Sequence, residues 1–203
     1  KEMKLDPNDE AYLLIEVDGI KEEEIMPQCE GILSVLELQS AGEVLFAQSS
    51  EGKDKLWFLR RRVGEAVKAV SIYKEEDTVV PRAKLPELMS TVKRLGREFG
   101  FRSICYGHAG DGNLHINILR DDLSDEVWSK KLPIAIRELF KEVVTLGGTL
   151  SGEHGIGLVQ KEYMDIACSP ANLFVQRGIK KVFDPKGILN PGKIFPNESH
   201  EGL

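Results

Sequence analysis

Two histidines flank a predicted tight turn, and their spacing suits the chelation of one metal ion. Asp111-Gly112 is the strongest short-range signal for a two-residue β-hairpin turn, and it lies inside the stretch 104–119. With these two residues at the tip, His108 falls directly opposite His115. Directly opposed residues of an antiparallel pair have Cβ atoms about 4.5–5.5 Å apart, a separation that lets two imidazoles reach one ion.

Side-chain alternation along the two strands assigns the hairpin residues to opposite faces. One face carries the polar or amphipathic side chains of Tyr106, His108, His115 and Asn117. The other face carries Cys105, Ala109, Leu114, Ile116 and Ile118. We expect the second face to be core and the first to be a polar site, which makes the Cys105 thiol a poor nucleophile.

A third histidine stands beside a carboxylate in Glu153-His154, where flanking glycines let backbone and ligand approach closely. Two neutral imidazoles and one carboxylate are a common ligand set for a catalytic metal with an open position. The alternative is that the hairpin histidines are ordinary surface groups and that Glu153-His154 is a turn bonded to its own backbone.

Composition excludes several classes of function. The chain has 203 residues, enough for one large domain or two small ones, and its net charge of −6 gives no electrostatic footprint for nucleic acid or an anionic membrane. No apolar run approaches the length of a membrane span. Its 3 cysteines form no disulfide framework, so we expect a reducing, cytoplasmic location. The first residue is not Met, which favours a fragment.

Apolar spacing and turn signals predict the elements that position these residues. Helices are expected over residues 21–39, 52–70, 86–99, 124–146 and 171–183. Strands are expected over residues 11–17, 43–48, 76–80 and 149–153, in addition to the hairpin. Because helices and strands alternate but one connection is a tight hairpin, we expect an α+β, ferredoxin-like fold with a mixed or antiparallel sheet and helices mainly on one face. No linker divides the chain, so residues 1–203 are expected to form one domain.

Three motifs follow one another along the chain: residues 107–115 at the hairpin, residues 152–157, and the turn-rich tail 184–193. Together they resemble the C-terminal half of the FAD-linked oxidases that act on D-2-hydroxy acids. That family includes the glycolate oxidase flavoprotein subunit, which we expect to be the nearest relative, D-lactate dehydrogenase and D-2-hydroxyglutarate dehydrogenase. The resemblance implies that residues 1–203 are the cap, or substrate, domain, that a separate N-terminal domain holds the FAD, and that this chain alone is inactive.

The resemblance also implies roles for four residues of the polar site. His108, His115 and Glu153 match metal ligands; the donor set permits zinc, manganese or iron, and the family favours zinc. His154 matches the general base that accepts the proton of the substrate's 2-hydroxyl group, a task that suits the pKa range of histidine. Hydride would then pass from the substrate to the flavin.

Four further residues match family positions. Arg60 matches an arginine that grips the substrate carboxylate, although it can equally be a solvated charge beside two neighbouring arginines. Asn117 matches a residue near substrate or flavin, Lys74 a lysine near the distal part of the substrate, and Asn190 a tail residue near the cofactor. Lys74 is one residue out of the family spacing, and Gly64 stands where some relatives have threonine.

We therefore predict the substrate- and metal-binding half of a flavin-dependent dehydrogenase that oxidises a small D-2-hydroxy acid, of the glycolate or D-lactate type, to the 2-oxo acid. Its partners would be this substrate, its own FAD domain and an electron-accepting subunit. Two alternatives stay open: a self-sufficient metal enzyme built on the two histidines and the carboxylate, and a non-catalytic oligomerisation domain.

Overall fold

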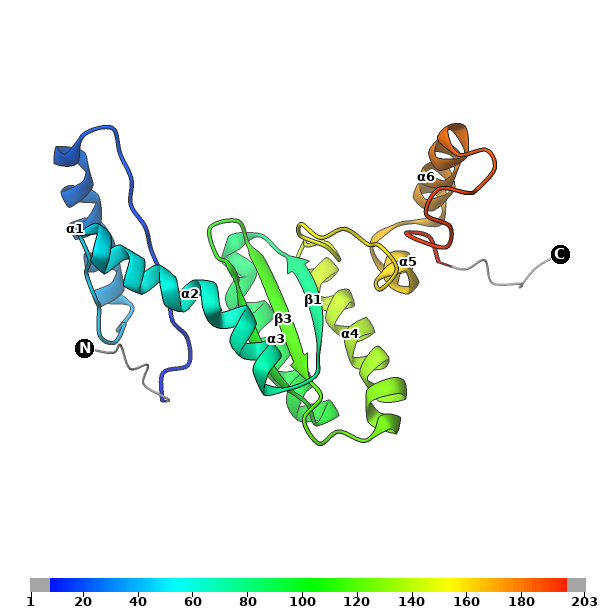
Figure 1. Ribbon diagram of the computed structural model, residues 1–203, viewed down its shortest axis with the longest axis horizontal. Coiled ribbons are helices and arrows are strands. Elements are labelled where there is room, and N and C mark those ends of the chain that lie inside the picture. The colour runs from blue at the N-terminus through cyan, green and yellow to red at the C-terminus, as the bar shows by residue number, and fades with distance from the viewer. Residues whose placement is uncertain (1–7, 197–203) are drawn as a thin grey trace. The chain divides into compact units, whose positions relative to one another are not determined.

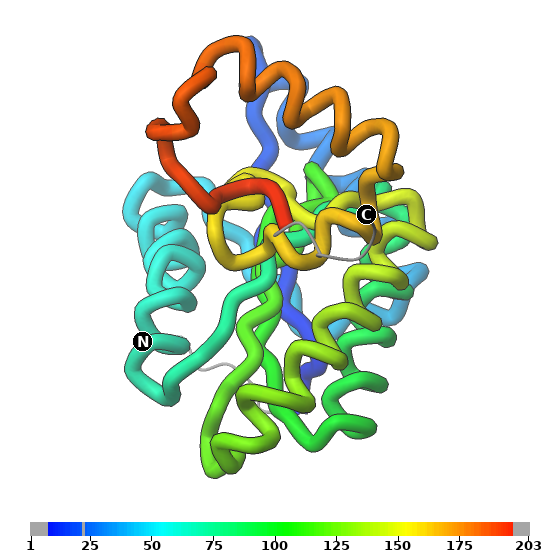
Figure 2. Tube along the Cα trace, turned by 90° about the vertical axis from the view of Figure 1, so that its right-hand side faces the viewer, coloured from blue at the N-terminus to red at the C-terminus, as the bar shows by residue number. Residues whose placement is uncertain are grey.

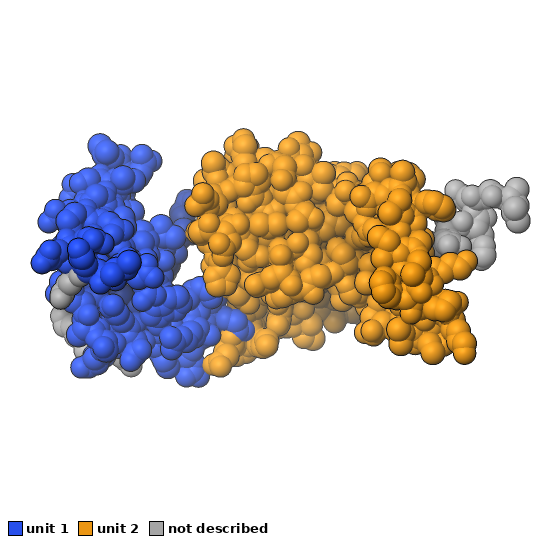
Figure 3. All heavy atoms as spheres, turned by 90° about the horizontal axis from the view of Figure 1, so that it is seen from above, with its two compact units in different colours: residues 1–64 blue, residues 65–203 orange. Residues whose placement is uncertain are grey.

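The computed structural model describes residues 8–196 and divides the chain into two compact units, residues 1–64 and residues 65–203 (Figure 3). The expectation that residues 1–203 form one domain stays a prediction. Among the described residues, no helix combines the length and the apolar composition that a membrane crossing needs.

The first unit is helical. α1 (Glu22–Leu38) and α2 (Ser50–Val70) confirm the helices expected in these two regions. The last turns of α2 belong to the second unit. The strands expected over residues 11–17 and 43–48 are wrong, because both segments lack regular structure and expose apolar side chains such as Leu13. Apolar composition favours a strand only where a neighbouring strand takes up its backbone hydrogen bonds, and within residues 8–196 neither segment has such a neighbour.

The second unit is built on a three-stranded antiparallel sheet in the order β1-β3-β2 (Figure 1). β1 (Tyr73–Val79) confirms the extended segment expected near residues 76–80. β2 (Arg102–His108) and β3 (Asn113–Leu119) form the expected hairpin. β3 is the central strand and is buried along its whole length, so the side chains on both of its faces are shielded from water.

The hairpin register differs from the expected one by two residues. His108 pairs with Asn113, and Tyr106 pairs with His115. The expectation that His108 lies directly opposite His115 is therefore wrong. Because side-chain orientation repeats every two residues, this shift still leaves both histidines on the same face of the sheet.

The turn between the strands explains the difference. It covers residues 109–112, where Asp111 N donates to His108 O at 3.0 Å and the Gly112 carbonyl accepts from Val80 N at 3.0 Å. Gly112 has a φ of +75°, and a Cβ atom on it would lie 2.0 Å from Val80 O. Asp111-Gly112 is thus the second half of a longer turn, and the glycine is required by its contact with the end of β1.

Two helices cover the apolar face of the sheet (Figure 2). They are α3 (Leu85–Phe99) and α4 (Leu132–Thr145), which follows a π-helical turn over Val127–Lys131, and they confirm the two helices expected there. Their buried side chains form one cluster with those of β3: Leu88, Val92, Leu95, Ile136, Leu139, Phe140, Val143, Leu114, Ile116 and Ile118. The α+β class with an antiparallel sheet is confirmed, and the arrangement is compatible with a ferredoxin-like fold.

Short elements complete the second unit. Single 3-10 turns cover Arg82–Lys84 and Lys161–Tyr163, and α5 (Met164–Ala167) precedes α6 (Pro170–Phe183). α6 confirms the last expected helix, and Ser169 caps it by accepting a hydrogen bond from the backbone of the first turn.

The strand expected over residues 149–153 is wrong. Only Thr149 forms a bridge, with Val79 at the end of β1. The N–H groups of Glu153 and His154 donate instead to the side chain of Asp77. The segment therefore leaves the sheet as a loop after one bridge.

Candidate metal centre

Three predicted ligands lie together on the polar face of the sheet. Donor atoms of His108, His115 and Glu153 all lie within 4.8 Å of one another. His108 ends β2, His115 lies in the middle of β3, and Glu153 lies in the loop after the Thr149 bridge. The two histidines are diagonal neighbours across the hairpin, a separation that long side chains can span.

His115 is the centre of this cluster and is buried. Its Nε2 atom lies 3.2 Å from Glu153 Oε1, and its Nδ1 atom lies 3.1 Å from Glu75 Oε1. A metal-bound imidazole commonly presents its second nitrogen to a carboxylate, which fixes the orientation of the ring. Two histidines and one carboxylate also suit the preference of zinc for nitrogen and oxygen donors, so the residues present fit a divalent ion.

His154 lies next to the cluster. Its ring centroid is 5.2 Å from that of His115, and its Nε2 atom is 3.7 Å from Glu153 Oε1. Glu75, His115 and His154 form a second group whose donor atoms lie within 4.8 Å of one another. The two groups share His115, and the first of them does not use His154, which is left to do other chemistry.

Asp77, which no sequence motif singled out, connects the sheet to the loop that carries Glu153. Its Oδ2 atom accepts from Glu153 N (2.8 Å) and His154 N (2.9 Å), and its Oδ1 atom accepts from Asn113 Nδ2 (2.7 Å). Burial alone would raise the pKa of Asp77, but the N–H groups of His154 and Glu153 and the amide of Asn113 together hold it below its usual range.

Gly152 is the residue that lets this loop come so close. A Cβ atom on Gly152 would lie 2.1 Å from Asn113 Nδ2 and 2.9 Å from Asp77 Oδ1. A side chain there would require the loop, the Asn113 amide or the Asp77 carboxylate to shift. The close approach of the loop to Asn113 and Asp77 therefore explains why a glycine precedes Glu153.

Asn117 lies on the histidine face and Lys74 lies on the other face. Asn117 is buried, and its Nδ2 atom donates to Ile104 O at 3.3 Å. Lys74 pairs with Ile118 of the apolar face, and its Nζ atom lies 3.7 Å from Glu76 Oε1. The structure thus brings Asn117, but not Lys74, to the same face as the three candidate ligands.

The two remaining predicted residues lie elsewhere in the chain. Arg60 is in α2, within the first unit. Asn190 is in the tail, where its Oδ1 atom accepts from Lys193 Nζ at 3.1 Å. The tail touches the loop of the site where Ile194 N donates to Gly157 O at 2.6 Å. The substrate role of Arg60 and the cofactor role of Asn190 stay predictions.

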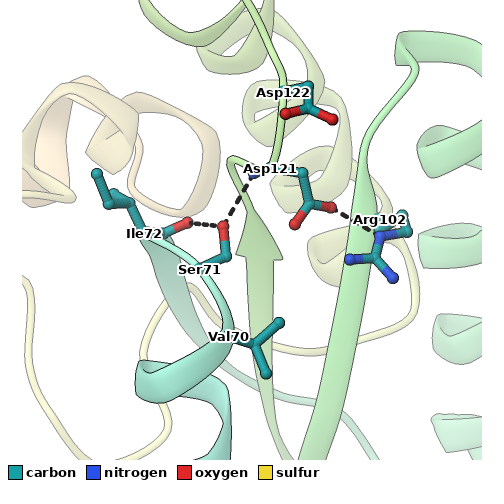
Figure 4. Close-up of a pocket in the computed structure, with 6 residues that line it drawn as sticks. All are labelled: Val70, Ser71, Ile72, Arg102, Asp121 and Asp122. Carbon is teal, nitrogen blue, oxygen red and sulfur yellow. Dashed lines mark hydrogen bonds and ion pairs between the residues drawn. The ribbon is translucent and has the colours of Figure 1, made fainter.

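A separate polar hollow lies at the opposite end of the sheet (Figure 4). It is lined by Val70, Ser71, Ile72, Arg102, Asp121 and Asp122. Arg102 Nε donates to Asp121 Oδ2 at 2.7 Å, and Asp121 N donates to Ser71 Oγ at 2.9 Å. These groups satisfy one another, and none of the predicted site residues lines the hollow, so it is not the candidate site.

Comparison with known proteins decides the family. Residues 1–194 match the family described as FAD linked oxidases, C-terminal domain. The chain belongs to the FAD-linked oxidases. This FAD-linked oxidase chain is 37% identical to D-lactate dehydrogenase of Anaerostipes hadrus, 32% identical to D-2-hydroxyglutarate dehydrogenase of Stutzerimonas stutzeri (strain A1501) and 35% identical to glycolate oxidase subunit GlcD of Escherichia coli (strain K12).

These alignments cover 91%, 91% and 92% of the FAD-linked oxidase chain, but only 39%, 40% and 37% of the respective relatives. The chain therefore spans well under half the length of the curated relatives it matches. The family that the three motifs indicated is confirmed.

Proposed function

We propose that this chain is the substrate- and metal-binding part of a flavin-dependent dehydrogenase that oxidises a small D-2-hydroxy acid, of the glycolate or D-lactate type, to the 2-oxo acid. The observation that carries the proposal is the cluster of His108, His115 and Glu153 on one face of the sheet, with His154 beside it. Membership of the FAD-linked oxidases supports FAD as the cofactor, held by the remainder of the full-length protein. The names of the relatives specify D-lactate, D-2-hydroxyglutarate and glycolate as candidate substrates.

We assign different roles to the residues of the cluster. His108, His115 and Glu153 would hold the divalent ion, for which we propose zinc. A bound ion would supply Lewis-acid stabilisation of the 2-hydroxyl oxygen, and FAD would supply the acceptor for the hydride of C2. His154 accepts the hydroxyl proton, so that the substrate loses one proton and one hydride. The side chain of His154 is 54% exposed in this chain.

Binding of the rest of the substrate falls to residues around the cluster. Asn117 shares the histidine face, but its side chain is buried and its Nδ2 atom donates to Ile104 O, so its contact with substrate or flavin stays a prediction. Arg60 would supply the planar fork that grips a carboxylate, and Asn190 would approach the cofactor. A substrate contact by Lys74 would require its side chain to reach around the edge strand β1, so this role stays a prediction.

We further propose a reducing, cytoplasmic environment and an electron-accepting partner. The unpaired state of Cys29, Cys105 and Cys168 supports the environment. The chemistry supports the partner, because a flavin that has taken up hydride must be reoxidised before the next turnover.

The experiment that tests the proposal is a substrate panel on the full-length protein with an artificial electron acceptor. We expect turnover of glycolate, D-lactate or D-2-hydroxyglutarate, and little turnover of the L enantiomers of the chiral acids. His154→Ala should lower kcat by about 100-fold or more, as expected for loss of a general base. Absence of turnover with every 2-hydroxy acid tested would contradict the proposal.

Two alternative functions predict different results in simple measurements. A self-sufficient metal enzyme would give a full-length protein with bound metal and no flavin absorbance. A non-catalytic oligomerisation domain would bind neither the metal nor a 2-hydroxy acid.

A further inference from the structure

We propose that Asp77 is a positioning residue for both the metal ligand Glu153 and the base His154. The inference rests on the proposed function of the cluster and extends it to a residue that touches neither metal nor substrate. Its task is to fix the backbone of the loop from which the two functional side chains leave.

One oxygen of Asp77 accepts three hydrogen bonds from this loop. Oδ2 accepts hydrogen bonds from Glu153 N (2.8 Å), His154 N (2.9 Å) and Ser151 Oγ (3.2 Å). Ser151 Oγ in turn accepts from Gly155 N at 2.7 Å, so the bonds enclose residues 151–155. Successive N–H groups that converge on one anion fix the backbone that carries them, and with it the direction of each side chain.

The position of Asp77 in the sheet places this loop beside the buried histidine. Asp77 is paired with His115 in the register of β1 and β3. A loop anchored on Asp77 is therefore held across from His115. This position explains two contacts of His115. Its Nε2 atom lies 3.2 Å from Glu153 Oε1, and its ring centroid lies 5.2 Å from that of His154.

Asp77 is unsuited to bind the ion or to move the proton itself. It is 2% exposed, and its Oδ1 atom is occupied by Asn113 Nδ2 at 2.7 Å. The distance from Oδ1 to His115 Nδ1 is 3.9 Å, which is too long for a hydrogen bond. Asp77 therefore contributes hydrogen-bond acceptors that hold the loop, and neither a metal ligand nor a base.

Two substitutions of Asp77 in the full-length, FAD-loaded protein separate position from charge. Asp77→Ala removes the acceptors, so zinc affinity, measured by competition with a chromophoric chelator, should fall about 10- to 100-fold, as for other carboxylates that orient metal ligands. Hydrogen exchange in peptides covering residues 151–155 should become faster. Asp77→Asn keeps an acceptor for the two N–H groups, and the Asn113 amide can rotate to accept from the new NH₂ group, so both properties should stay near wild type.

Two further variants complete the design. Thr78→Val removes a buried hydrogen bond to Leu114 O (3.0 Å) from the apolar face of the same strand. This control should lower stability without changing zinc affinity or exchange in residues 151–155. Gly152→Ala keeps the Asp77 carboxylate but puts a Cβ atom 2.1 Å from Asn113 Nδ2 and 2.9 Å from Asp77 Oδ1, so the present contact between the loop and Asp77 cannot be kept unchanged. This variant should show losses in the same direction as Asp77→Ala, which keeps the test decisive where Asp77→Ala does not fold.

Wild-type zinc affinity and loop protection in Asp77→Ala or in Gly152→Ala would overturn the proposal. Equal losses in Asp77→Asn and Asp77→Ala would also overturn it, because the charge would then carry the effect. His115→Ala distinguishes this failure from that of the proposed function. Zinc binding that survives His115→Ala disproves the metal centre, whereas loss in His115→Ala without loss in Asp77→Ala disproves the positioning role alone.

Discussion

At the level of single residues, His115 should be the most sensitive position, because each of its ring nitrogens lies against a carboxylate. His115→Ala should abolish the stabilisation that zinc gives to the protein, and His154→Ala should keep it, since His154 is assigned to proton transfer. A ligand at one hundred times its Kd stabilises the folded state by about 2.7 kcal/mol. Thermal melts of both variants with and without zinc measure the effect, and the opposite pattern would mean that ligand and base are exchanged.

The thiol of Cys105 should be inert in the folded protein. Burial raises its pKa to about 11, so the thiolate that reacts is scarce at neutral pH. Cys105 pairs with Ile116 and packs against the core cluster. Alkylation followed by mass spectrometry should therefore find it modified only after denaturation. Rapid labelling of Cys105 in the native protein would show that it lies on the polar face.

The face of each hairpin residue was predictable, although the register was not. Side-chain alternation has a period of two, so a register error of two residues still assigns His108 and His115 to one face. The hydrogen bonds from Glu153 and His154 to Asp77 could not be predicted in this way. These two residues follow Asp77 by 76 and 77 positions, and no periodicity connects residues so far apart.

At the level of elements, β1 carries two adjacent carboxylates on opposite faces of the sheet. Asp77 lies on the histidine face, whereas Glu76 pairs with Ile116 and is fully buried. Glu76 Oε2 accepts from Gln160 Nε2 at 3.3 Å, and Lys74 Nζ lies 3.7 Å from Oε1. Burial raises the pKa of Glu76, and the contacts with Lys74 and Gln160 only partly oppose it.

Glu76→Gln should stabilise the fold at neutral pH, because glutamine removes a buried negative charge whose burial raises the pKa of the carboxyl group. The pKa of Glu76 in the folded protein lies above the ordinary value of 4.5. The wild type therefore loses stability as the pH rises from 4.5 through this folded-state pKa. Glutamine carries no charge and can still bond to Gln160. Denaturant unfolding over the acidic to neutral range should show two stability curves that coincide below pH 4.5 and diverge above it.

The exposed carboxylate of Glu87 in α3 provides the control for this experiment. Glu87→Gln should change stability by less than about 0.5 kcal/mol at any pH. A Glu76→Gln protein that is less stable than wild type at neutral pH would show that the contact with Lys74 outweighs the burial of the charge.

Helices were more predictable than strands for a physical reason. α3 and α4 contain their own backbone hydrogen bonds, so an apolar stripe was enough to indicate them. A strand depends on a partner that its own sequence does not specify. Residues 149–153 have a strand-like composition, but Asp77 takes up the N–H group of Glu153 in place of a neighbouring strand.

At the level of the whole molecule, the core and the candidate metal centre both lie in the unit formed by residues 65–203. Expressed alone, residues 1–203 should therefore bind a divalent ion and retain no FAD. The chain matches a C-terminal domain and covers only 37% to 40% of relatives such as GlcD and D-2-hydroxyglutarate dehydrogenase. Gel filtration after incubation with FAD, followed by an absorption spectrum and metal analysis, checks both statements, and stoichiometric flavin would contradict the division of roles.

The bonds from Asp77 to the loop also bear on the order of folding. They join residues 76 and 77 positions apart, whereas the pairing of β2 with β3 lies within residues 102–119. Because the entropy lost on closing a chain segment grows with its length, the hairpin should form before the loop docks. Pulse-labelled hydrogen exchange during refolding should protect the amides of β3 earlier than those of Glu153 and His154. If the proposed ligands are correct, a newly synthesised chain would present two histidines on a formed hairpin before its third ligand arrives, and it would gain the complete metal site only after the loop has docked.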